Sequence, residues 1–178
     1  AVAVDSTYLD DSTRGHPADM VQYAQPERDV KPAVAAMRTA VDGHEGGPDV
    51  VYHGRRFFVD DESAALQPPV PREQSNWFHR LPLPWYLETM DATPASTATV
   101  EGLERHLQSR PPVVVAEADV AGEVRSRVEG YRTFEFDTRA HTDGPSRGTS
   151  VVVFVDARRS NASGAADGRA QVRRLLVE

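Results

Sequence analysis

The chain has 178 residues, of which 39% are hydrophobic and 26% charged, and its net charge is -7. This length suits one α/β domain with a real core, and the acidic balance argues against nucleic-acid binding, which depends on clustered Lys and Arg. No stretch holds the roughly 18 consecutive apolar residues of a membrane-spanning helix, and the absence of cysteine excludes disulfides, thiolate nucleophiles and cysteine-based zinc sites.

The basic residues are strongly biased, because Lys31 is the only lysine and every other positive charge is an arginine. An acid excess with almost no lysine indicates a protein adapted to high salt, where hydrated carboxylates keep the surface soluble. High genomic GC content also favours arginine and is the alternative. The acidic run at residues 60–62 favours the salt interpretation.

The first third of the chain predicts a strand, a helix and another strand. Residues 1–9 alternate as a strand does. A helix is expected over residues 30–41, with Asp29 as its cap. Its apolar face consists of Val30, Val34, Met37 and Val41. β-Branched and aromatic residues predict a buried strand over 49–53, and 56–59 is either its continuation or a second short strand.

Residues 60–84 change in composition, from an acidic run to a segment rich in proline and aromatic residues. Prolines forbid a long helix here, but Pro84 suits the first turn of a short helix over 85–90. A weak strand is expected over 93–99. An amphipathic helix follows, with Thr99 as its cap and its end near residue 110.

The last third again alternates strands and helices. The expected elements are a strand over 113–116, a helix over 121–129, a strand over 131–136 and a strand over 150–156. Residues 1–157 are expected to form one α/β domain and residues 158–178 a flexible tail. The pattern predicts a three-layer Rossmann-like sandwich with a mostly parallel sheet, whose last two strands can form an antiparallel edge pair.

Signatures of catalysis are missing from the sequence. There is no Gly-x-Gly-x-x-Gly string to approach a dinucleotide and no Gly-x-Ser-x-Gly nucleophile elbow. The six histidines lack the spacing of a zinc site. We therefore assign no catalytic residue and expect no cofactor.

Three adjacent carboxylates, Asp60, Asp61 and Glu62, are weak candidates for a hard-cation site, because several oxygens could reach one ion. They lack the alternating ligands and central glycine of a calcium loop. A solvated acidic turn is the favoured interpretation.

The aromatic segment holds the candidates for ligand or membrane-domain contact, which are Trp77, His79, Arg80, Trp85 and Tyr86. Flat aromatic faces stack on sugar C–H surfaces, and arginine supplies forked donors for a sugar or a lipid headgroup. The alternative is that these side chains fasten an irregular loop to the core. That alternative is favoured for Trp85 and Tyr86, while Trp77 stays open.

Asn161 begins an Asn-Ala-Ser triplet, which is an acceptor sequence for N-glycosylation. Such triplets often arise by chance. Asn161 is therefore a glycosylation candidate that matters only if the domain lies outside the cell.

Several of these segments together resemble a known family. They are residues 21–26 (Val-Gln-Tyr-Ala-Gln-Pro), 60–63, 67–69, 77–87 and the closing strand 151–156. In this order they are similar to the C-terminal soluble domain of haloarchaeal flippase-activity-associated membrane proteins, and Leu-Pro-Leu-Pro-Trp-Tyr-Leu is the most specific element. That group is similar to protein mannosyltransferases and other polytopic glycosyltransferases that use lipid-phosphate sugar donors.

The resemblance implies a domain on the outer face of an archaeal plasma membrane, following a bundle of helices. In related transferases the acidic catalytic residues lie in loops of that bundle, so none can be carried over to this chain. The chain departs from the family pattern in the polar insertion at 139–148 and in the long tail after Asp156.

Three hypotheses follow for the function. The first is a non-catalytic accessory domain that packs on its own transmembrane region through residues 67–87 and helps shape a site for lipid-linked sugars. The second is a freestanding sugar or small-ligand binding module, with the aromatics in a crevice at the carboxyl ends of the strands. The third is an enzyme with a scattered site using Asp60, His79 and Arg80.

Overall fold

The computed structural model describes residues 30–65, 72–138 and 149–160. Expectations for the strand at 1–9, the insertion at 139–148, Asn161 and the tail from 161 onward lie outside these residues. The helices are α2 (Val30–Val41), α3 (Glu62–Ala65), the 3-10 helix η2 (Arg72–Arg80), α4 (Leu83–Glu88), α5 (Val100–Leu107), α6 (Ala121–Arg125) and α7 (Ala157–Ser160). The strands are β1 (Val50–His53), β2 (Pro94–Thr97), β3 (Val113–Glu117), β4 (Tyr131–Thr138) and β5 (Thr149–Asp156).

The five strands form one mixed sheet in the order β2-β1-β3-β5-β4. β1 pairs in parallel with both β2 and β3, whereas β5 runs antiparallel to both β3 and β4. The α/β class and the antiparallel pairing of the last two strands are therefore confirmed. β5 lies inside the sheet, between β3 and β4, so only one strand of that pair is at the edge.

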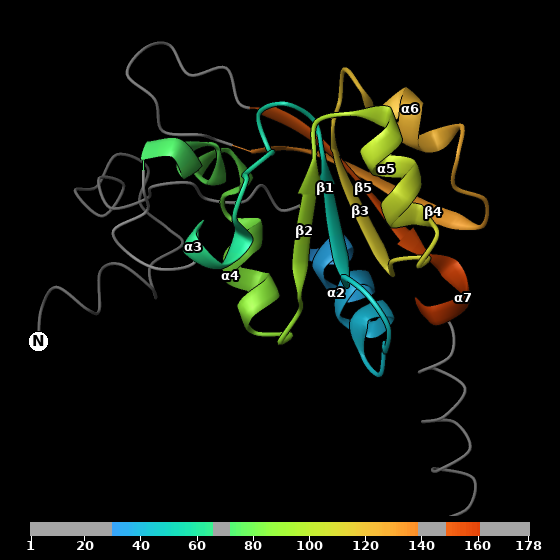
Figure 1. The fold of residues 1–178 in the computed structure, drawn as a ribbon. Helices are drawn as coiled ribbons and strands as arrows, with labels where there is room; N and C mark the ends of the chain where they lie inside the picture. Colours follow the sequence, from blue (N-terminus) through green and yellow to red (C-terminus); the bar gives the residue numbers. More distant parts are fainter. Residues whose placement is uncertain (1–29, 66–71, 139–148, 161–178) are drawn as a thin grey trace, which may run out of the picture.

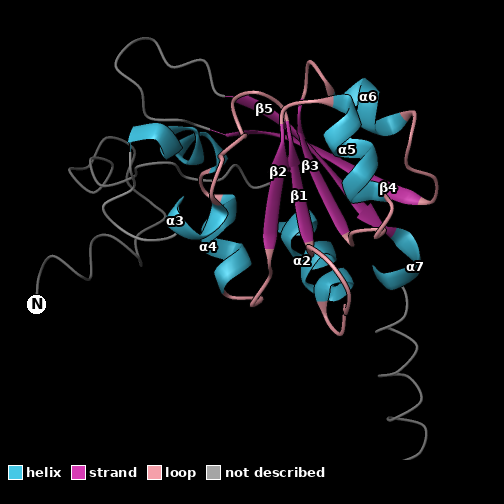
Figure 2. Cartoon of the chain, in the orientation of Figure 1, coloured by secondary structure: helices cyan, strands magenta, loops and turns pink. Residues whose placement is uncertain are grey.

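Helices pack on both faces of the sheet, because side chains alternate along each buried strand. On one face, Tyr52 and Val115 belong to a hydrophobic cluster with α2 and α4. On the other face, Val114 and Phe154 belong to a second cluster with α5 and α6. Figures 1 and 2 show α2 on the opposite side of the sheet from α5 and α6.

The helices begin and end for local reasons that the sequence mostly reveals. α2 has the predicted bounds. α5 begins at the predicted cap, where the Thr99 side chain accepts a hydrogen bond from the Gly102 amide. α4 begins at Leu83 with Pro84 in its first turn, two residues earlier than expected. Among the described residues, no helix is long and apolar enough to cross a bilayer.

The strand expected at 56–59 does not form. Gly54 has a φ of 130°, a conformation that favours glycine, and there the chain turns away from the sheet. The Arg56 amide then donates to a carboxylate oxygen of Glu117 at 2.7 Å, and the Phe57 and Phe58 amides donate back to the Gly54 carbonyl. β1 therefore ends at His53, and the pattern of apolar residues after it reflects packing under α4. The helix expected over 121–129 is also shorter and ends at Arg125.

Candidate functional site

Arg80 is the centre of a buried polar network at the end of η2. Its side chain is 1% exposed and donates to both carboxylate oxygens of Glu62, at 2.7 and 2.9 Å. It also donates to the Phe57 carbonyl, from Nε at 2.8 Å and from a terminal nitrogen. The guanidinium lies 4.3 Å from the centre of the Tyr52 ring. Arg80 thus holds α3, η2 and β1 together, and its charge is matched by Glu62.

Tyr52 lies next to this network but is not satisfied by it. The side chain is in β1, and the residue is 1% exposed. Its hydroxyl has no hydrogen-bond partner among the described residues. Burial raises the pKa of Tyr52 well above its ordinary value, against the lowering effect of Arg80, so the hydroxyl stays neutral.

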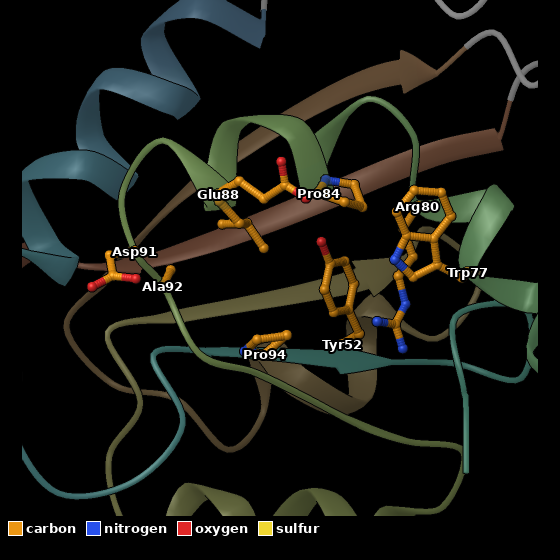
Figure 3. A pocket seen from close by; sticks show the side chains of 9 residues that line it. Tyr52, Trp77, Arg80, Pro84, Glu88, Asp91, Ala92 and Pro94 are labelled. Atoms are coloured by element: carbon orange, nitrogen blue, oxygen red, sulfur yellow. The ribbon is translucent and has the colours of Figure 1, made fainter. Parts of the chain in front are cut away.

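A cavity of about 230 Å³ opens above Tyr52, between α4 and the sheet. Figure 3 shows the Tyr52 hydroxyl pointing toward α4, between Pro84 and Glu88. The other lining residues are Trp77, Arg80, Leu87, Asp91, Ala92 and Pro94. Carbon atoms of these residues form most of the wall, and the Tyr52 hydroxyl, which has no partner among the described residues, is buried beneath it. Small-molecule sites commonly have this composition.

A second polar group lies at the carboxyl ends of the parallel strands. His53, 1% exposed, contacts Glu123 of α6 through Nε2 at 2.8 Å, while its Nδ1 has no partner among the described residues. Glu117 ends β3 and accepts the Arg56 amide. After β1 and β3 the chain continues on opposite faces of the sheet. Open α/β sheets commonly bind ligands at the carboxyl ends of two such strands. The carboxylate of Glu117 fills the space beside Gly54, whose absent Cβ would collide with it.

Two of the three acidic candidates for a metal site, Asp61 and Glu62, have separate structural partners. The Asp61 carboxylate accepts hydrogen bonds from the amides of Ser63 and Ala64 at the start of α3. It also accepts one from the Ser63 hydroxyl, which is the main reason why the pKa of Asp61 is lowered. Glu62 is paired with Arg80. In the part of the chain that the structure describes, no three His, Cys, Asp or Glu side chains come together as a metal site. The turn is thus held by capping and by one ion pair.

The aromatic candidates are divided between the cavity and the surface. Trp77 is partly buried and lines the cavity, and its ring meets Phe78 edge to face at 5.5 Å. Trp85 is 72% exposed, so the interpretation of Trp85 as a core anchor is wrong. His79 and Tyr86 are partly buried and do not line the cavity. Sequence reasoning missed Tyr52, because a tyrosine inside an apolar strand is typical of ordinary core packing.

These features define a mixed α/β domain with one tyrosine-based cavity under α4 and with most of its buried charges engaged in holding the fold. The family model of the Agl23 flippase-associated protein C-terminal domain matches residues 30–156. The chain therefore belongs to this family, and the resemblance found in the sequence is confirmed. No curated protein and no solved structure matches the chain.

Proposed function

We propose that this chain is a non-catalytic accessory domain of a polytopic, glycosyltransferase-like membrane protein that handles lipid-linked sugars in protein glycosylation. The observation that carries this proposal is the family match over residues 30–156. The domain lies on the extracytoplasmic side of the plasma membrane and packs on its own transmembrane region. The single lysine and the net charge of -7 support a salt-adapted source, and the resemblance to the haloarchaeal proteins implies an archaeal one.

The contact with the transmembrane region is made by η2 and α4. These helices carry Phe78, which is 50% exposed, and Trp85, which is 72% exposed. Large aromatic side chains in water are enriched where a protein meets a partner, since their burial there contributes strongly to binding. Arg80 and Glu62 fix the base of the same segment. The segment is therefore rigid enough to present both rings to a partner.

Crosslinking in the intact membrane protein tests this contact. A photoreactive amino acid replaces Trp85 in the full-length product, and crosslinked peptides are identified by mass spectrometry. The matched control replaces Glu135, an exposed residue of β4 at the opposite edge of the sheet from β2. We expect crosslinks to transmembrane or juxtamembrane peptides from position 85 and none from position 135. Equal yields from both positions would contradict the proposed contact.

The sequence upstream of Ala1 in the intact gene product gives a faster test of the whole proposal. Several hydrophobic spans of about 20 residues, with acidic residues in their outer loops, would support the accessory role. A single signal peptide alone would overturn it. The freestanding binding module would then become the leading function, and the cavity of about 230 Å³ under α4 is the observation that favours it.

The assignment to glycosylation is tested by function in the cell. Substituting Phe78 and Trp85 together by serine in the intact protein should reduce glycan occupancy of secreted proteins and raise the pool of lipid-linked sugars. Because both side chains are exposed, the variant should fold normally, which thermal unfolding of the isolated domain checks. Unchanged glycan occupancy with a stably expressed variant would contradict a role in this process.

A further inference from the structure

The cavity under α4 has an apolar wall and an acidic mouth. We propose that it binds the side chain of an arginine presented by another polypeptide segment, with the guanidinium at the Glu88 and Asp91 carboxylates and the stem against the apolar wall. The proposal rests on the membrane contact described above only for the source of this arginine, which would be a loop of the transmembrane region that packs on η2 and α4. The recognition itself involves only described residues and can be tested without that region.

The carboxylates of Glu88 and Asp91 give the mouth of the cavity a negative charge. Both residues are exposed and line the cavity. Among the described residues, neither carboxylate is paired with a basic side chain. Arg80 also lines the cavity, but its side chain is 1% exposed and its charge is matched by Glu62. Two uncompensated carboxylates at one opening attract a cation.

Arg38 of α2 lies near the same two carboxylates and is a potential partner for them. It lines a neighbouring hollow together with Glu88 and Asp91. Its guanidinium, however, donates to the carbonyl and to the hydroxyl of Thr89, at 3.3 and 3.0 Å. Asp42 lines the same hollow and adds a further carboxylate there. The acidic mouth therefore remains available to a cation from outside the domain.

The apolar wall favours an organic cation over a metal ion. Calcium and magnesium ions require about six or more oxygen ligands, whereas carbon atoms form most of this wall. Across the described ranges, no three His, Cys, Asp or Glu side chains come together as a metal site. Trp77, Pro84 and Pro94 instead offer carbon surface. An arginine meets both demands, because its stem packs on apolar surface while its planar guanidinium stacks on aromatic rings and forms forked hydrogen bonds with carboxylates.

The size and outline of the cavity suit one extended side chain. Its volume of about 230 Å³ is below the roughly 300–1,000 Å³ of sites for drug-sized ligands. At roughly 30 Å³ per water molecule in the liquid, it exceeds what one or two waters fill. In the view of Figure 3, Asp91 and Trp77 lie on opposite sides of Tyr52, and the Glu88 side chain lies between them. A long, narrow group therefore contacts more of the lining residues than a compact one does.

Tryptophan fluorescence can report directly on this cavity. The chain has two tryptophans, and Trp85→Phe removes the exposed one, so Trp77 in the cavity wall becomes the only emitter. The 178-residue chain with this substitution is titrated with Nα-acetyl-arginine amide and with the corresponding citrulline and lysine derivatives. We expect a saturable change with the arginine derivative, at a dissociation constant on the order of millimolar. The citrulline derivative has nearly the same shape without the charge and should bind at least about tenfold more weakly. The lysine derivative should bind about threefold more weakly, because an ammonium group lacks the planar fork.

A double variant tests whether the two carboxylates bind the guanidinium. Glu88→Gln with Asp91→Asn removes both charges at nearly constant size. Asparagine suits position 91, because Asp91 has a φ of 53° and asparagine tolerates this left-handed conformation. We expect the arginine derivative to bind at least about tenfold more weakly, at a melting temperature that is unchanged or slightly raised. The matched control is Glu101→Gln with Asp119→Asn, which makes the same change in net charge at two exposed residues outside the cavity and should leave binding unchanged.

Three results would overturn the proposal. They are no saturable change with the arginine derivative, equal binding of the arginine and citrulline derivatives, and equal binding to the two double variants. Equal binding of the lysine derivative would contradict the assignment to a guanidinium. Free arginine is titrated in parallel, and tighter binding of the free amino acid than of the amide would contradict a polypeptide as the source.

These results are separate from the crosslinking test of the membrane contact, because Trp85 does not line the cavity. Saturable binding of the arginine derivative without crosslinks from position 85 would keep the recognition and remove its assigned source. Crosslinks from position 85 without binding of the arginine derivative would keep the membrane contact and overturn the arginine site.

Discussion

The two faces of the sheet carry similar apolar strands but pack differently. On the face of α5 and α6, Leu103 and Val124 meet Val114, Val152 and Phe154 in a cluster of buried apolar side chains. On the face of α2 and α4, the apolar cluster is joined by the ion pair of buried Arg80 with partly buried Glu62, and a cavity lies over Tyr52. β1 contributes to both faces, through the adjacent residues Tyr52 and His53.

The two faces also differ in the surroundings of their buried polar atoms. Within the described part of the chain, Tyr52 and His53 each have one buried polar atom without a hydrogen-bond partner. The Nδ1 atom of His53 belongs to a ring whose Nε2 contacts Glu123, whereas the Tyr52 side chain lies beneath the cavity and its hydroxyl is itself buried. A small α/β domain closes most of its core by apolar packing. The cavity on the α4 face therefore departs from this packing and requires an explanation.

Breaking the Arg80 network should give the largest loss of stability. Arg80→Met leaves the Glu62 carboxylate and the Phe57 carbonyl without their donors, on the face that holds the cavity. Removing one partner of a fully buried ion pair typically costs about 3–5 kcal/mol, and because the Glu62 side chain is 21% exposed we expect a loss near the lower end of this range. Urea unfolding of the variant measures this loss as a lower midpoint at an unchanged slope.

The control for this experiment is an arginine whose ion pair is more exposed. Arg127 contacts Glu104 at 3.0 Å, with side chains that are 30% and 58% exposed. Arg127→Met should therefore cost no more than about 1 kcal/mol. Similar losses in the two variants would mean that Arg80 is not the buried anchor of η2.

Truncating one leucine on each face compares a filled core with an open one. Leu103→Ala removes a fully buried side chain from the α5 face and should cost about 2–5 kcal/mol. Leu87→Ala removes a side chain that lines the existing cavity and therefore loses fewer contacts. Its loss of stability should lie at or below the lower end of that range. Thermal or urea unfolding ranks the two variants. A larger loss at Leu87 would show that the α4 face is as tightly packed as the other.

Much of the fold was readable from the sequence, because it depends on local patterns. The helix at Val30–Val41, the Thr99 cap and the apolar run of β3 were predicted from spacing and residue type. The insertion of β5 between β3 and β4 was not, since strand order depends on long-range pairing. The false strand at 56–59 arose because Phe57 and Val59 are buried outside a sheet, beyond the turn at Gly54.

The candidate site was predicted only in part. Trp77 and Arg80 were chosen because aromatic and arginine side chains in a proline-broken segment are typical of binding surfaces. In the structure, the Arg80 guanidinium donates its hydrogen bonds to Glu62 and to the Phe57 carbonyl. The positions of these two residues relative to η2 depend on tertiary packing. Tyr52 was not chosen, since the sequence does not reveal whether a buried hydroxyl finds a partner.

Helices α5 and α4, on opposite faces of the sheet, also differ at their amino ends. This difference predicts a smaller effect on stability. Thr99 caps α5 by accepting the Gly102 amide at 3.1 Å, whereas α4 has no side-chain cap and begins with prolines. Thr99→Ala should lower stability by about 1 kcal/mol. Thr89→Ala, which removes a hydroxyl after the end of α4, is the comparison and should cost less, because the hydrogen bonds of this hydroxyl to the Tyr86 carbonyl and from Arg38 are both exposed. Equal losses would mean that the cap does not stabilise α5 selectively.

The smallest expected effect is a pH dependence on the α5 face. Partial burial, reinforced by Arg105, lowers the pKa of His106 below its ordinary 6.5. Between the lowered value and 6.5 the unfolded chain binds more protons than the folded one, so His106 makes the domain less stable as the pH falls through this window. In His106→Gln this contribution disappears, and urea midpoints at about pH 7.5 and about pH 5.5 should differ less than in the wild type. A larger difference between the two midpoints in His106→Gln than in the wild type would contradict this prediction. It would mean that a carboxylate such as Glu62 outweighs burial and raises the pKa of His106.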